Sequence, residues 1–167
     1  MVNIASLFSK KKFGKVIAPL RTVYAAQPAL LGMVTKVVSV DKKLSLPTET
    51  KRLISTFVAT LNNCPFCADL NLFVATQADV EKRKLKALLN FRNEPAFSEK
   101  EKAALAYCEE VTLTKSCTDA CFSELLRHFS EKEIVEITWL NAVENYFNLI
   151  AKPLQVPSDS LCNGTAD

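Results

Sequence analysis

Apolar residues recur at every third or fourth position along most of this chain, which is the spacing that predicts amphipathic helices. The clearest such segment begins near Pro47 and ends at Asn62 and Asn63, whose polar side chains favour a turn. Its apolar face is formed by Leu53, Ile54, Phe57, Val58 and Leu61. A second helix is predicted to begin at Cys64–Cys67, because Pro65 is tolerated in a first turn and apolar positions continue after it. Two cysteines therefore open a helix.

Further helices are indicated on both sides of this pair. Residues 15–40 predict two helices, and Asp79 is expected to cap one that runs to about Leu89. Ser98–Glu101 and Ser130–Glu133 each match a capping box, in which a serine and a glutamate three residues later cap each other's backbone N–H groups.

The segment from Ile134 to Ile150 is apolar on more than one side, so we expect it to be buried centrally or in a subunit interface. Pro153 and Pro157 then end helix formation. The same segment carries a polar row, formed by Asn141, Asn145 and Asn148. This row either lines a pocket near the cysteines or bonds across a subunit interface.

Composition agrees with a single all-α domain. The chain has 167 residues, of which 49% are hydrophobic and only 3 are glycine, and this favours long helices over turn-rich β structure. We predict a bundle of about six to eight helices at residues 15–157. We expect it to be preceded by a basic segment at residues 1–14 and followed by a flexible tail at residues 158–167.

The net charge of +3 is too small to predict binding to nucleic acid or to an anionic membrane, and basic runs such as Lys10–Lys12 are short. Met1–Leu7 lacks the regions of a signal peptide, and no apolar run approaches the ~20 residues of a membrane helix. We therefore expect a cytoplasmic protein without nucleic-acid or membrane partners. In that compartment the six cysteines are expected to be thiols, metal ligands or catalytic groups rather than a disulfide framework.

The motif Cys64-Pro65-Phe66-Cys67 is the main candidate for chemistry. A helix N-terminus stabilises a thiolate by directing backbone N–H groups at the sulfur, and the spacing allows a disulfide. One cysteine can then attack a peroxide or a disulfide, and the other can resolve the product. Two alternatives stay open. The pair is half of a zinc site completed by Cys117, Cys121 or His128, or it is an inert structural motif.

The remaining cysteines and the histidine have simpler explanations. Cys117 and Cys121, spaced i,i+4 on a predicted helix, are expected to be separate thiols because their Cβ atoms would lie too far apart for a disulfide. Cys108 lies on an apolar stripe, and Cys162 is expected to be exposed in the tail. His128 precedes a capping box, so helix-end capping explains it. We expect no metal and no cofactor.

Five stretches of the chain carry a family resemblance: Thr48–Ile54, Val58–Cys67, Phe97–Glu101, His128–Thr138 and Asn141–Tyr146. Together they resemble the carboxymuconolactone decarboxylase and alkyl hydroperoxidase D family, over roughly residues 20–157. The resemblance implies an all-helical, usually oligomeric fold. It also implies that the redox members use a CxxC dithiol as a peroxidase or disulfide reductant and receive electrons from a thiol partner.

The resemblance assigns attack to Cys67 and resolution to Cys64. The family's redox members carry a glutamate twelve residues before the first cysteine and a histidine four residues after the second, and here these positions hold Arg52 and Asn71. Asparagine cannot exchange a proton near neutral pH and arginine stays protonated, so the family's proton relay is incomplete. Arg52 can still stabilise a thiolate or an anionic substrate. Glu49, on the same helical face, either replaces the missing carboxylate or forms a surface pair with Arg52.

We therefore expect a CxxC-dependent thiol redox protein of the peroxidase or disulfide reductase type, in which Asn71, Arg52 and Glu49 support Cys64 and Cys67. Its expected partners are a small hydroperoxide or disulfide, a thiol electron-donor protein and further copies of the chain. Two other functions are compatible with the sequence. One is a non-catalytic helical scaffold, which the lost proton relay favours. The other is lactone decarboxylation, against which the cysteine pair argues.

Overall fold

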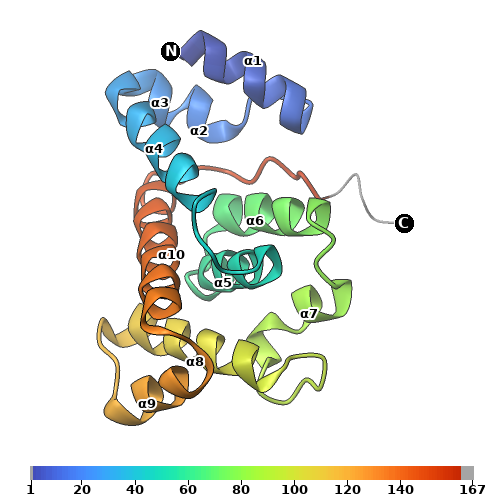
Figure 1. Ribbon diagram of the computed structural model, residues 1–167. Helices are drawn as coiled ribbons and strands as arrows, with labels where there is room; N and C mark the ends of the chain where they lie inside the picture. The colour runs from blue at the N-terminus through green and yellow to red at the C-terminus, as the bar shows by residue number, and fades with distance from the viewer. Residues whose placement is uncertain (1, 163–167) are drawn as a thin grey trace.

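The computed structural model describes residues 2–162, which fold into helices joined by loops (Figure 1). The helices are α1 (Val2–Phe13), α2 (Ala18–Arg21), α3 (Val23–Ala26), α4 (Leu31–Asp41), α5 (Thr48–Leu61), α6 (Pro65–Gln77), α7 (Lys82–Lys86), α8 (Glu99–Thr114), α9 (Asp119–His128) and α10 (Glu131–Ala151), with 3₁₀ turns at Pro28–Leu30 and Leu88–Asn90. Seven of the α-helices have ten residues or more. No strand occurs within the described residues. The prediction of an all-α fold is confirmed.

Helix α5 forms the centre of the bundle (Figure 1). It packs against α6, α8 and α10. The core around it includes the fully buried side chains Phe57, Phe91, Leu105, Leu125 and Ile137. Phe57 of α5 meets Phe91 edge to face, with 5.4 Å between the ring centroids. The apolar face of α5 is broad in the sequence, and this agrees with the helices that cover α5 on several sides.

Most of the predicted helix boundaries are confirmed. Helix α5 ends at Leu61, and Cys64 is the N-cap residue of α6. Ser98 and Ser130 each form a complete capping box with the glutamate three residues later, at the starts of α8 and α10. The local chemistry of these caps therefore sets where the long helices begin.

The helix predicted to begin at Asp79 begins instead after Glu81. Helix α6 extends to Gln77, and its end is closed by a hydrogen bond from Val80 N–H to Ala75 O at 3.1 Å. Asp79 lies in this closing turn with a φ of +57°. Aspartate tolerates the left-handed conformation better than most residues, so it marks a helix end here rather than a helix start.

The first forty residues are more fully folded than predicted. The basic segment expected at residues 1–14 is largely helix α1. The buried Ser9 hydroxyl accepts a hydrogen bond from Ile17 N–H at 3.0 Å, which ties α1 to the start of α2. Of the two helices predicted at residues 15–40, the first is divided at Thr22 into α2 and α3.

Within the described residues, no single helix is both long enough and apolar enough to cross a membrane. The segments Ala18–Ala26 and Pro28–Asp41 reach that length and apolarity only when taken together, and they meet at a bend of 116°.

The prediction of a flexible tail at residues 158–167 is wrong for its first half, because residues 158–162 lie against the bundle. Asp69 of α6 accepts hydrogen bonds from the Ser158 hydroxyl at 2.7 Å and from the Leu161 backbone N–H at 3.0 Å. The Leu161 side chain is buried. These contacts make the segment after α10 a strap that passes between α1 and α6 (Figure 1). The rest of the predicted tail lies outside the described residues.

Asp159→Ala is expected to lower the free energy of unfolding by about 1–3 kcal/mol. The Asp159 carboxylate accepts a hydrogen bond from Ala18 N–H at 2.5 Å and pairs with the Arg21 guanidinium at 3.0 Å. Since Ala18 is fully buried, its N–H would lose its acceptor without gaining water. Urea denaturation measures the change. Asp159→Asn keeps a carbonyl acceptor and should lose less, whereas negligible losses in both variants would contradict the role of this contact.

Candidate functional site

The predicted cysteine pair lies at the start of α6. Asn63 has a φ of +50°, a left-handed conformation that turns the chain between α5 and α6. Cys64 is the N-cap residue of α6, and Cys67 lies in its first turn. Their Sγ atoms are 2.6 Å apart, and both thiols are free. The residues are only 1% and 4% exposed. The structure thus brings the two cysteines together in a buried setting.

Residues from both ends of the chain cover the pair. Cys64 and Cys67 share an apolar cluster with Leu20 of α2, Tyr24 of α3 and Val156 of the C-terminal strap. The last of these reaches the cluster because the chain doubles back after α10 (Figure 1). The cysteine site is therefore built on α5 and α6 and closed by segments far away in the sequence.

Cys64 is the more acidic of the two thiols. Its pKa is lowered to about 7, chiefly by the hydrogen bond that it shares with the Cys67 thiol. The backbone N–H groups of Cys67 and Phe66 and the positive charge of Lys152 also favour the thiolate, whereas burial opposes it. A helix N-terminus stabilises a cysteine thiolate in this way.

Cys67 is held in its protonated form. Its pKa is raised well above the ordinary value by the hydrogen bond shared with Cys64, by burial and by the negative charge of Glu144. Hydrogen bonding with Asn148 acts in the opposite direction. The first proton to leave the pair therefore leaves from Cys64. The family resemblance assigns the attack to Cys67, whereas this geometry favours Cys64 as the resting thiolate.

Glu144 of α10 is a functional candidate that the sequence analysis did not single out. It is 6% exposed, and burial raises its pKa to about 7. The Asn148 amide donates a hydrogen bond to its Oε1 at 2.7 Å, and Asn71 also hydrogen-bonds to it. Asn71 therefore lies at the site as a partner of Glu144. The sequence feature that could have identified Glu144 is its place as a glutamate inside a helix that is apolar on several sides.

The polar row on α10 bonds within the chain, and its last member, Asn148, reaches the cysteine pair. The Asn62 amide, at the end of α5, donates to Asn145 Oδ1 at 3.0 Å and to Asn148 Oδ1 at 2.8 Å. These bonds fix the orientation of the Asn148 amide, which then interacts with both Cys67 and Glu144. Of the two alternatives for this row, a place near the cysteines therefore holds for Asn148.

Arg52 and Glu49, predicted to support the cysteines, are bound elsewhere. Arg52 pairs with Asp41 at the end of α4, at 2.8 Å. Lys84 of α7 pairs with Glu49 at 2.9 Å and with Glu101 at 2.7 Å. Both predictions for Glu49, as a replacement carboxylate and as the partner of Arg52, are therefore corrected. The physical reason is that α4 and α7 supply nearer charges, which spacing along α5 does not reveal.

The structure separates the ligands that a zinc site with Cys64 and Cys67 would need. Cys117 and Cys121 lie at the start of α9 and His128 at its end, on the opposite side of the bundle from α6 (Figure 1). His128 Nε2 lies 3.2 Å from Glu124 Oε1, one turn earlier in the same helix.

The settings of the other cysteines agree only in part with those predicted. Cys108 is fully buried in the core, as predicted. Cys162 is only partly exposed, and its backbone N–H donates to Asp69 Oδ1 at 3.3 Å. Cys117 precedes the N-cap residue Thr118, so it does not share one helix with Cys121. The i,i+4 helical distance expected between them therefore does not apply.

Alkylation of Cys64 is expected to follow a pKa of about 7. The measurement is the rate of iodoacetamide modification against pH, in a chain whose cysteines other than Cys64 and Cys67 are replaced. Cys67→Ala should move the midpoint up toward ~8.5, because the main hydrogen bond to the thiolate is removed. A midpoint that Cys67→Ala leaves unchanged would contradict this cause.

Comparison with known proteins places this geometry in context. The Escherichia coli K12 protein YnjA is 27% identical over 156 residues, which cover 92% of this chain and 85% of that protein. The Agrobacterium tumefaciens protein ATU0492, whose description links it to antioxidant defence and AhpD, matches with a TM-score of 0.78 and 24% identity, over 82% of this chain and 95% of that chain. The debrominase Bmp8 matches with a TM-score of 0.84 and 20% identity, over 98% and 89%. The two structural likenesses show a shared fold.

The family match spans the cysteine site itself. The sequence model of the carboxymuconolactone decarboxylase family matches residues 25–110, slightly more than half of the 167 residues. This range contains α5 and α6 with both cysteines of the CxxC motif, and it ends within α8. The chain therefore belongs to the carboxymuconolactone decarboxylase family.

Proposed function

We propose that this chain is a CxxC-dependent thiol redox protein that reduces a small hydroperoxide or a disulfide. One observation carries the proposal: the free sulfurs of Cys64 and Cys67 lie 2.6 Å apart at the N-terminus of α6, where the pKa of Cys64 is lowered to about 7. A thiol with a pKa near neutral pH is substantially ionised and therefore nucleophilic. A second thiol beside it can close a disulfide.

With a hydroperoxide, the Cys64 thiolate attacks the outer oxygen. An S–O bond forms while the O–O bond breaks, which leaves a sulfenic acid on Cys64 and an alkoxide that takes up a proton to become an alcohol. Cys67 then attacks the Cys64 sulfur, expels a hydroxide that is protonated to water, and completes the disulfide. The protein gives up two electrons in this cycle. We propose that a thiol partner protein in the cytoplasm, where thiols are kept reduced, returns them by disulfide exchange.

Glu144 is the proposed proton donor for the leaving group. The family's histidine position holds Asn71, which has no exchangeable proton near neutral pH. Glu144 bonds to Asn71 and has a pKa of about 7, so a large fraction of molecules carry its proton at neutral pH. Donation leaves Glu144 as a carboxylate, which can then accept the proton of Cys67 as that thiol attacks the Cys64 sulfur. The same carboxyl can therefore assist both steps.

The proposal is tested by assaying the reduced chain against hydrogen peroxide, cumene hydroperoxide and a small aromatic disulfide, with dithiothreitol as the electron donor. A brominated aromatic belongs in the same panel, because the fold is shared with a debrominase. We expect turnover of a hydroperoxide or the disulfide and no carbon dioxide release from carboxymuconolactone. A complete lack of dithiol-dependent turnover, or decarboxylation of the lactone, would overturn the proposal.

A second candidate function is a non-catalytic helical scaffold. The observation in its favour is burial, since Cys64 and Cys67 are only 1% and 4% exposed. Reaction of the folded chain with hydroperoxide distinguishes the two functions. A scaffold would leave both thiols unmodified in the folded chain during long exposure to hydroperoxide, whereas the redox protein requires the covering segments to open and admit the oxidant.

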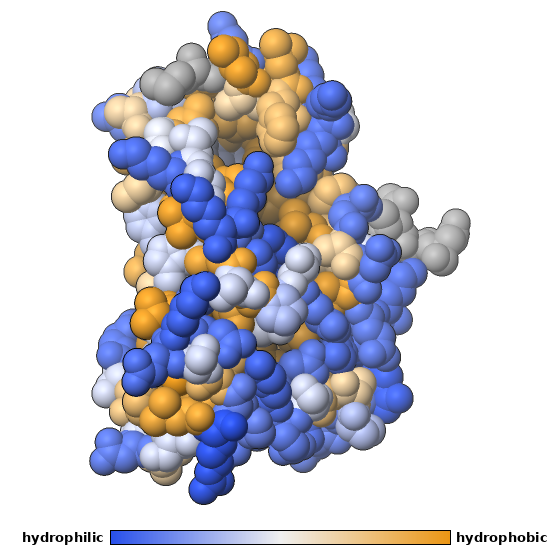
Figure 2. All heavy atoms as spheres, in the orientation of Figure 1, coloured by the Kyte–Doolittle hydropathy of each residue, from blue (hydrophilic) through white to orange (hydrophobic). Residues whose placement is uncertain are grey.

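We also propose that the chain assembles with further copies of itself through α1. Ile4, Leu7 and Phe8 lie on one face of this helix and are 74%, 69% and 65% exposed. Figure 2 shows apolar side chains gathered over α1 at the top of the molecule. Leu7→Glu with Phe8→Glu is expected to convert an oligomer to a smaller species in light-scattering chromatography. Lys10→Glu, which charges an exposed position on another side of α1, is the control. An unchanged mass for both variants would contradict this interface.

A further inference from the structure

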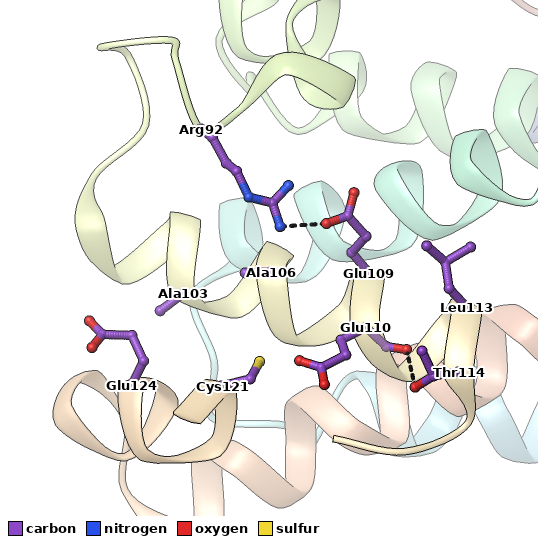
Figure 3. A pocket seen from close by; sticks show the side chains of 9 residues that line it. All are labelled: Arg92, Ala103, Ala106, Glu109, Glu110, Leu113, Thr114, Cys121 and Glu124. Carbon is purple, nitrogen blue, oxygen red and sulfur yellow. Dashed lines mark hydrogen bonds and ion pairs between the residues drawn. The ribbon is translucent and has the colours of Figure 1, made fainter. Parts of the chain in front are cut away.

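A second cluster of reactive side chains lies far from the cysteine pair of α6. Cys117, Cys121 and Glu110 each offer a ligand atom, and these atoms all lie within 4.8 Å of one another. Figure 3 shows the Glu110 carboxylate and the Cys121 sulfur beside each other, where the end of α8 meets the start of α9. All three side chains are partly exposed, so an ion in solution can reach them.

The loop between α8 and α9 holds this cluster together. Lys115 ends α8 in the left-handed conformation, with a φ of +63°, and reverses the chain. Glu110 then accepts hydrogen bonds from the Thr118 backbone N–H at 2.8 Å and from the Thr118 hydroxyl at 3.3 Å. Because Thr118 is the N-cap residue of α9, these bonds fix the carboxylate next to the cysteines on either side of that cap. Such bonds to a carboxylate orient it as a metal ligand.

We propose that Glu110, Cys117 and Cys121 bind a zinc ion. Two thiolates and one carboxylate are a donor set that zinc prefers, at distances of about 2.3 Å to sulfur and 2.0–2.2 Å to oxygen. Tetrahedral geometry would then place the ligand atoms roughly 3.5–3.8 Å apart. The present separations of at most 4.8 Å therefore need to contract by about 1 Å, which rotations of the cysteine side chains supply. Binding would displace the thiol protons.

An open cavity adjoins two of the three proposed ligands. Glu110 and Cys121 line a cavity of about 490 Å³, together with Arg92 and Leu113. Three protein ligands beside an open cavity leave room for water or another exchangeable ligand on the metal. This site does not involve Cys64 or Cys67, so it stands independently of the proposed redox function.

The test uses the full chain with Cys64→Ser and Cys67→Ser, which removes competing thiolates, prepared reduced and metal-free. Titration with Co²⁺ is expected to produce thiolate-to-cobalt charge-transfer absorption and the intense visible bands of tetrahedral cobalt at one equivalent, and Zn²⁺ should abolish them. Cys117→Ser with Cys121→Ser should remove these bands. Cys117→Ser alone, which changes a residue outside the helices, serves if the double variant does not fold.

Matched control variants distinguish the loss of a metal ligand from a general effect of the substitution on the protein. Glu110→Gln should weaken Zn²⁺ binding by at least about 10-fold. Glu109→Gln, which changes the neighbouring carboxylate that pairs with Arg92, should not weaken it. Cys162→Ser should leave the cobalt bands intact. The proposal is overturned if no tetrahedral cobalt spectrum appears, if the spectrum survives loss of Cys117 and Cys121, or if the pair forms a disulfide that excludes the metal under the reducing conditions.

Discussion

Cys64→Ser is expected to lower hydroperoxide or disulfide turnover by at least about 10³-fold, because it removes the only thiol of the pair with a pKa near neutral. A serine hydroxyl is not ionised at neutral pH and cannot form the disulfide. Steady-state turnover with dithiothreitol as electron donor measures the loss. Cys162→Ser, which changes a thiol outside this pair, is the control and should retain the parent rate.

Cys67→Ser separates the roles of the two cysteines. Steady-state turnover should also fall, but Cys64 should still react once and stop as a sulfenic acid, which dimedone labelling followed by mass spectrometry detects. If Cys64→Ser instead retains the single reaction and Cys67→Ser loses it, attack belongs to Cys67, as the family resemblance assigns it. Unchanged turnover in both variants would contradict the proposed function itself.

Glu144→Gln is expected to lower the rate of the first oxidation step by about 10²–10⁴-fold, the range for loss of a general acid. Glutamine keeps the size of Glu144 and its bonding to Asn148 and Asn71 but carries no exchangeable proton. In the parent, the rate should rise as Cys64 ionises and fall as Glu144 loses its proton, both near pH 7. The variant should lose the falling limb.

Glu136→Gln is a suitable control for this variant. Glu136 is another buried glutamate of α10, but its carboxylate accepts hydrogen bonds from the backbone N–H groups of Ser45 and Leu46. Its loss should affect stability and leave the pH profile of the reaction in place. Equal rates and equal profiles for the Glu144→Gln variant and the parent would contradict a proton-donating role for Glu144.

The same carboxyl makes folding stability depend on pH. The pKa of Glu144 is raised from 4.5 to about 7 in the folded chain, so the folded form binds an extra proton between these values. Its contribution to the free energy of unfolding is fully present below pH 4.5 and is lost as the pH rises through about 7, a change of roughly 3 kcal/mol. In Glu144→Gln this part of the pH dependence should disappear.

The sequence predicts best the helix starts and turns that residues close together in the chain determine. Ser98 and Ser130 cap their helices through side chains three residues away, and Cys64 reaches the N-cap of α6 because Asn63 turns the chain just before it. The place of the cysteine pair follows from the same local rules. The prediction that Asp79 begins a helix is wrong for a local reason too. An aspartate can cap a helix start, but it also tolerates the left-handed conformation that ends a helix.

Contacts between segments that are distant in the sequence cannot be predicted from these local rules. Glu144 lies 77 positions after Cys67 in the sequence, and only the packing of α10 on α5 and α6 brings it to the site. Glu49 and Arg52 have the right spacing for each other, yet Lys84 and Asp41 pair with them instead. The strap after α10 has few apolar residues, and the buried Asp159 holds it through polar bonds that no periodicity reveals.

The most direct measurement is thiol mapping by mass spectrometry after the reduced, full-length chain reacts with one equivalent of cumene hydroperoxide. We expect a loss of two mass units and a single disulfide between Cys64 and Cys67, reversed by a dithiol. The proposed function would be contradicted if Cys64 and Cys67 remained free thiols while the hydroperoxide persisted, or if oxidation occurred elsewhere in the chain.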